Sequence, residues 1–71
     1  MKDEVYLKRL GDKIVELRKE KGITQLELAE RLDTKNTQIR RIERGTVNST
    51  INMLRKISKE LGVSVSDLVN I

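Results

Sequence analysis

Three arginines within five positions are the side chains of this sequence best suited to binding another molecule. They are Arg40, Arg41 and Arg44, in the stretch DTKNTQIRRIERG that spans residues 33–45. A guanidinium group stays charged, and its planar fork of N–H groups suits bidentate hydrogen bonds to a phosphate or to guanine. Whether that chemistry is available depends on the element that carries the arginines and on the charges around them.

A helix over residues 36–44 would place these arginines on its outer face. On a helical wheel of about 100° per residue, Ile39 and Ile42 fall together and mark the buried side. Arg44 and Thr37 lie opposite the isoleucines, and the other two arginines flank them. The outward surface of this helix is therefore expected to be basic, with one hydroxyl among the guanidinium groups.

Two interpretations of this basic face compete, a solvated amphipathic helix and a binding surface. The face carries no lysine, and it lacks the carboxylates that are mixed among the cations of residues 1–22. The helix also follows another short helix through Asp33-Thr34-Lys35, as in a helix-turn-helix that presents its second helix to a major groove. Glu43 falls toward the buried side, where a carboxylate needs a cationic partner. These features favour a binding surface.

The rest of the chain carries the signals of four further helices. Apolar residues recur at helical spacing before Gly22 and again before Gly62, so each glycine is expected to end a helix, as Gly45 does for residues 36–44. The two stripes are Leu7, Leu10, Ile14 and Leu17, and Ile51, Leu54, Ile57 and Leu61. Thr50 is expected to cap the second of these helices.

Capping patterns mark the two shortest helices. The expected capping-box pairs are Thr24 with Glu27 and Ser64 with Asp67, and the hydrophobic-staple pairs are Ile23 with Leu28 and Val63 with Leu68. The inner face of the earlier helix is expected to comprise Leu26, Leu28, Ala29 and Leu32. The later helix should run through Val69. No alternating pattern of a strand appears, so the expected fold class is all-α.

Composition limits the classes of function. The chain has 71 residues, 37% of them hydrophobic and 37% charged, which suits one small globular domain over residues 1–71. It has no cysteine and no histidine, so disulfides and thiolate or imidazole metal sites are excluded. We expect no cofactor and no enzyme activity, because no glycine-rich phosphate loop or acid pair is present. Tyr6 is the only aromatic residue, and base stacking on single strands needs several.

The positive charge is concentrated in one part of the chain. The formal net charge is +4. Residues 35–46 hold four positive side chains and one negative, whereas residues 1–22 hold seven positive and five negative. A local excess of this kind indicates a nucleic-acid partner. No signal peptide or apolar membrane span is evident, so the cytoplasm is the expected location.

The segment LRKEKGITQLELAERLDTKNTQIRRIERG closely resembles the helix-turn-helix of the lambda-repressor-like, Xre-type DNA-binding domains. A looser match continues through TINMLRKISKELGVSVSDL, so the resemblance covers roughly residues 8–68. It implies a compact five-helix domain whose second and third helices form the helix-turn-helix, at about residues 24–45. It also implies double-stranded DNA as the partner.

The resemblance implies roles for individual residues. Those on positions that face the major groove are Lys35, Asn36, Thr37, Arg40 and Arg41. Those on positions that contact DNA phosphates are Gln25, Arg44, Thr46 and Asn48. Arg18 and Glu43 match a pair that forms an ion pair between the first and third helices in the family. This pair would supply the partner that a buried Glu43 needs.

The chain also departs from the family pattern. Asp33 stands where glycine is usual between the second and third helices, and it would have to adopt a left-handed conformation. Lys35 stands where a capping serine or threonine is usual, so Thr34 or Asn36 could cap instead and shift the helix start by one residue. The loop of residues 46–49 lacks the lysines and arginines that many relatives place there.

The expected function is transcriptional regulation, as a repressor or autoregulator that reads an inverted-repeat operator as a homodimer. The dimer interface implied by the resemblance comprises Val63, Val65, Leu68, Val69 and Ile71. Val63, Val65 and Leu68 could equally finish the core of the same chain. The alternative function is a protein-interaction module, such as an antitoxin or anti-regulator with another protein as its main partner. We expect no small-molecule ligand.

Overall fold

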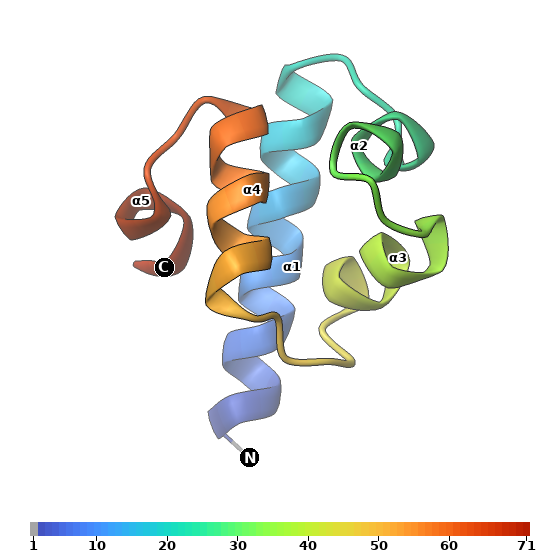
Figure 1. Ribbon diagram of the computed structural model, residues 1–71. Helices are drawn as coiled ribbons and strands as arrows, with labels where there is room; N and C mark the ends of the chain where they lie inside the picture. The colour runs from blue at the N-terminus through green and yellow to red at the C-terminus, as the bar shows by residue number, and fades with distance from the viewer. Residues whose placement is uncertain (1) are drawn as a thin grey trace.

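Residues 2–71 are described by a computed structural model, and they form five helices and no strand (Figure 1). The helices are α1 (Lys2–Glu20), α2 (Gln25–Arg31), α3 (Asn36–Arg44), α4 (Ile51–Leu61) and α5 (Val65–Val69). In Figure 1, α2 and α3 lie on one side of the long α1 and α5 lies on the other, with α4 drawn in front of α1. The all-α prediction with five helices is confirmed. None of the helices in this part of the chain is long and apolar enough to cross a membrane.

The apolar stripes meet in one core. All five helices contribute to it, and its fully buried members are Ile14, Leu28, Ile39, Ile57 and Leu68. The prediction that Leu26 and Ile51 belong to the core is wrong, because the side chain of Leu26 is 56% exposed and that of Ile51 is 66% exposed. On a wheel of about 100° per residue, Leu26 lies about 160° from the buried Leu28, and Ile51 lies at the edge of the apolar stripe of α4.

Side-chain caps begin three of the helices. Thr24 and Glu27 form the expected capping box, with reciprocal bonds of 3.0 Å. Thr50 Oγ1 accepts from Met53 N at 3.1 Å, and Ser64 Oγ accepts from Asp67 N at 2.9 Å. These bonds satisfy N–H groups that the first turn of a helix cannot satisfy itself.

The turn between α2 and α3 depends on Asp33. This residue has a φ of 54°, the left-handed conformation expected for it. Its N–H donates to Glu30 O at 3.1 Å, and Thr34 N donates to Ala29 O at 2.9 Å. These two bonds are those of a Schellman motif, in which glycine normally holds the left-handed position. Asp33 therefore sets the angle between the two helices without glycine.

The capping box makes a prediction about pH. The pKa of Glu27 lies below its ordinary value of 4.5, because hydrogen bonds from Thr24 stabilise the carboxylate. The backbone of Thr24 makes the larger contribution and its side chain the smaller one. A lowered folded-state pKa gives stability that is fully present above the unfolded-state value and is lost as the pH falls through the folded-state value. The melting temperature of the wild type should therefore exceed that of Glu27→Gln at pH 7, and the difference should shrink below pH 4.5. A difference independent of pH would contradict this.

Candidate nucleic-acid interface

The outer face of α3 has the composition that the helical wheel predicts. Ile39 and Ile42 are buried and hold the helix on the core. The exposed residues of the opposite face are Thr37, Arg40, Arg41 and Arg44, with Lys35 exposed at its leading end. Glu43, the one carboxylate of α3, is buried. The outer face of α3 therefore presents only cations and neutral polar groups.

The first turn of α3 differs from both capping alternatives. The N-cap is Lys35, which makes no side-chain capping bond, and the helix starts at Asn36 without a shift. Capping by Thr34 or Asn36 is therefore wrong. Asn36 is half-buried, and its Oδ1 atom is buried without a hydrogen-bond partner among residues 2–71. The free N–H groups of this turn remain open to an acceptor from outside.

An open hollow lies beside the basic face of α3. It brings Gln38, half-buried on α3, together with residues at the end of the preceding turn and with Met53 of α4. Its lining is Asp33, Thr34, Lys35, Thr37, Gln38, Arg41 and Met53. Gln38 is a candidate site residue that was not expected from the sequence, although its wheel position next to Arg41 is a signal that could have identified it.

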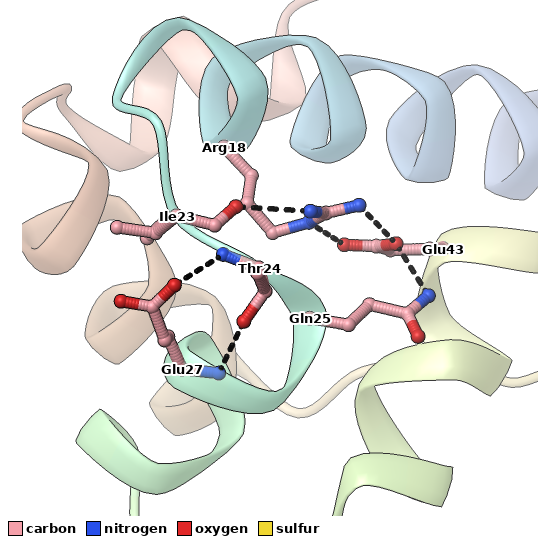
Figure 2. Close-up of polar contacts among 6 residues, drawn as sticks. All are labelled: Arg18, Ile23, Thr24, Gln25, Glu27 and Glu43. Carbon is pink, nitrogen blue, oxygen red and sulfur yellow. Dashed lines mark hydrogen bonds and ion pairs between the residues drawn. The ribbon is translucent and has the colours of Figure 1, made fainter.

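A buried polar network fixes α3 against α1 and α2 (Figure 2). Arg18 Nε donates to Glu43 Oε2 at 2.8 Å and its Nη2 donates to Glu43 Oε1 at 3.2 Å. The two side chains are only 11% and 4% exposed. Gln25 Nε2 also donates to Glu43 Oε1, at 2.8 Å. The expected ion pair is thus present, and Gln25 joins it.

Arg18 also links this network to the turn before α2. Its Nη1 donates to Ile23 O at 3.0 Å, and Ile23 leads directly into the capping box of Thr24 (Figure 2). One guanidinium group therefore connects α1, the start of α2 and the end of α3. A bidentate pair with further hydrogen bonds has the geometry that offsets the cost of burying two charges.

The loop after α3 offers few donors to a phosphate. Thr46 donates through both its backbone N–H and its hydroxyl to Arg41 O, each at 3.1 Å. Both donors of Thr46 are therefore used within the free chain, and its contact with a phosphate stays a prediction. Asn48 is exposed, and Ser49 Oγ is buried without a partner among residues 2–71.

The C-terminal apolar residues divide between the core and the surface. Leu68 is completely buried in the core of its own chain, so its assignment to a dimer interface is wrong. Val63 and Val69 are partly buried against the same core, while Ile71 is 40% exposed. Tyr6 Oη donates to Val69 O at 2.7 Å and ties this end to α1.

Curated relatives of this chain are regulators. It is 41% identical over 61 residues to the control protein C.BamHI of Bacillus amyloliquefaciens, covering 84% of this chain and 75% of that protein. It is 40% identical over 62 residues to the HTH-type transcriptional regulator SinR of Bacillus licheniformis, covering 86% of this chain and 56% of that protein. A match of 33% over 60 residues to the immunity repressor of Bacillus phage phi105 spans 84% of this chain and 42% of that protein.

Solved structures agree with the fold. The clp gene regulator ClgR of Corynebacterium glutamicum matches with a TM-score of 0.86 at 29% identity, over 92% of this chain and 69% of that one. The restriction-modification controller protein C.AhdI of Aeromonas hydrophila matches with a TM-score of 0.83 at 27% identity, over 87% of this chain and 94% of that one. The helix-turn-helix family model matches residues 14–68. The chain therefore belongs to the helix-turn-helix family, as its resemblance to the lambda-repressor-like, Xre-type domains indicates.

Proposed function

We propose that this chain is a sequence-specific regulator of transcription that binds double-stranded DNA through α3. The observation that carries the proposal is the charge of the outer face of α3, where Arg40, Arg41 and Arg44 are exposed and the only carboxylate is turned inward and paired. The relatives named as control proteins, repressor and transcriptional regulator support the same role. Repression is the form of control that the name of the phage phi105 immunity repressor favours, and autoregulation is the alternative form.

The geometry favours base contacts for some residues on and near α3 and phosphate contacts for others. Side chains at and beyond its N-terminal turn would contact base edges, and these are Lys35, Asn36, Thr37, Arg40 and Arg41. Arg44, Gln25 and Asn48 would contact phosphates at the borders of the groove. One amide N–H of Gln25 is bonded to Glu43, so it orients α3, and the other N–H is free to donate to a phosphate at the same time.

A homodimer on an inverted repeat follows from the size of the module. The chain measures 31 × 23 × 21 Å, and one recognition helix contacts too few base pairs to select a site in a genome. Two such helices need a separation of about 34 Å to enter successive major grooves. With Leu68 in the core, the proposed dimer surface comprises Val63, Val65, Val69 and Ile71.

Selection of bound sequences from a random double-stranded library tests this proposal, with light scattering on the same protein. We expect an inverted repeat whose half-sites are about one helical turn apart, bound by two chains. Failure to enrich any sequence would overturn DNA recognition. Enrichment of one unpaired half-site by a monomer at tens of micromolar would overturn the dimer.

The alternative function, a protein-interaction module, is favoured by the exposed Leu26 on α2. Salt dependence separates the two functions. The logarithm of a DNA association constant falls by about 0.9 per phosphate neutralised for each tenfold rise in salt. A partner held mainly by an apolar contact at Leu26 would not show that slope.

Arg41→Ala should lower affinity for the selected operator by roughly 1–3 kcal/mol and relax the preference at one base position. The physical reason is that a guanidinium fork on guanine is lost, so the other bases become acceptable there. The measurement is a competition assay over all four bases at each position. Arg31→Ala serves as the control, because Arg31 is an exposed arginine of α2 that lies 3.9 Å from Glu60 of α4 and belongs neither to the basic face of α3 nor to the proposed dimer surface. An equal loss on every sequence would make Arg41 a phosphate contact.

A further inference from the structure

The backbone of α1 lies against the end of α3. A Cβ atom added to Gly45 would lie 2.7 Å from Lys8 N and 2.8 Å from Lys8 Cα. Gly45 directly follows Arg44, so the Lys8 backbone is in contact with the residue next to this arginine. The side chain of a lysine spans several ångströms from its Cα, so the Lys8 ammonium can reach an anion bound near this end of α3.

The surroundings of Lys8 leave it free to change partner. Lys8 Nζ donates to Asp12 Oδ1 at 2.8 Å, one helical turn away, and the two side chains are 61% and 60% exposed. An exposed pair of this kind contributes little to stability. The ammonium can therefore move from the carboxylate to another anion at low cost.

The segment after α3 needs such a cation if α3 enters a major groove. Residues 46–50 contain no lysine or arginine, and both Thr46 donors are used by Arg41 O. Arg44 is thus the only cation among residues 44–50. The contact at Gly45 shows that α1 is the element that lies there.

We infer that Lys8 is a further DNA-binding residue, which contacts a backbone phosphate beside the Arg44 site. In the free protein Asp12 holds the Lys8 ammonium, and in the complex its carboxylate opposes the phosphate by like-charge repulsion. Asp12 therefore weakens binding. This inference rests on the proposed function, because it requires α3 to bind double-stranded DNA.

A simpler role for Lys8 is to stabilise the negative C-terminal end of α3, near which it lies. That role affects folding and leaves the salt dependence of DNA binding unchanged. The two roles therefore differ in a measurable quantity. Lys13 offers a matched control, because it is also a lysine of α1 and its Nζ lies 3.7 Å from Glu16 Oε2. It lies about 200° around the helix from Gly11, whose Cα faces α3.

Fluorescence anisotropy with the selected operator, from 0.05 to 0.3 M salt, tests the inference on four proteins: the wild type, Lys8→Gln, Asp12→Asn and Lys13→Gln. Lys8→Gln should weaken binding roughly five- to tenfold per protomer at about 0.1 M salt and reduce the salt slope by about 0.9 per protomer. Asp12→Asn should tighten binding. Lys13→Gln, with the same net charge as Lys8→Gln, should keep the wild-type slope.

Equal slopes for Lys8→Gln and Lys13→Gln would overturn the inference while leaving the proposed function intact. Absence of DNA binding by the wild type would overturn both. Melting temperatures of all four proteins, without DNA, complete the test. A fall in the melting temperature of Lys8→Gln with an unchanged salt slope would assign Lys8 to the stabilisation of α3 alone.

Discussion

Replacing Glu43 by alanine should destabilise the fold by about 3–5 kcal/mol, the cost of leaving one partner of a buried ion pair without the other. The Arg18 side chain is only 11% exposed, so its guanidinium group would lose the carboxylate with little compensating contact with bulk water. Gln25 would lose its acceptor as well. A domain of this size is stable by only about 0.05–0.15 kcal/mol per residue, so the variant should be partly unfolded near 37 °C.

Urea denaturation and thermal melting measure this effect. In a domain of 60–100 residues, 1 kcal/mol corresponds to roughly 4–8 °C, so the melting temperature should fall by more than about 10 °C. Glu16→Ala is the matched control, because Glu16 belongs to an exposed pair with Lys13 at 3.7 Å. Its effect should stay within about 0.5 kcal/mol. A melting temperature unchanged by Glu43→Ala would contradict the structural role of the pair.

A double replacement separates the cost of a broken pair from the value of the intact one. Arg18→Met with Glu43→Leu removes both charges and keeps apolar volume, and such exchanges are often neutral for stability. We expect this variant to be more stable than Glu43→Ala. It should nevertheless bind DNA less well than the wild type, because Gln25 would no longer be tied to α3 and the Ile23 carbonyl would lose its donor.

Local patterns predicted most of the fold because the bonds that begin and end these helices are local. The bounds of α3 and the Thr24 capping box each depend on residues within a few positions in the sequence, whereas the left-handed Asp33 was expected from the family pattern, in which glycine is usual there. The pairing of Arg18 with Glu43 came from the family resemblance, since the helical wheel showed only that Glu43 needs a cation. The basic face of α3 followed from helical periodicity alone.

Tertiary features could not be predicted from periodicity. The errors at Leu26 and Ile51 are of another kind, because a wheel of about 100° per residue already sets Leu26 about 160° from Leu28 and Ile51 at the edge of its stripe. Leu68 was compatible with both core and interface until the packing of α5 was known. Gly11 gave no signal at all, although a Cβ atom there would overlap the Glu43 carbonyl oxygen. That close approach of α1 and α3 is a property of the packed molecule.

Replacing Gly45 by alanine should destabilise the fold by about 2–5 kcal/mol, because two costs add at this position. Gly45 has a φ of 74°, and a residue with a Cβ atom loses roughly 1–2 kcal/mol in the left-handed conformation. The new Cβ atom would also lie 2.7–2.9 Å from backbone atoms of Leu7 and Lys8. Backbone cannot rotate away as a side chain can, so overpacking adds about 1–3 kcal/mol.

Gly22→Ala isolates the first cost. Gly22 has nearly the same φ, 71°, but a Cβ atom there would meet nothing within 4 Å. Its denaturation midpoint in urea should therefore fall by the conformational cost alone, and the fall for Gly45→Ala should be larger. Because the strain at Gly45 can be relieved only by moving the end of α3 away from α1, Gly45→Ala should also weaken DNA binding, whereas Gly22→Ala should not. Equal losses of stability in the two variants would show that α1 and α3 do not approach as closely as the structure has them.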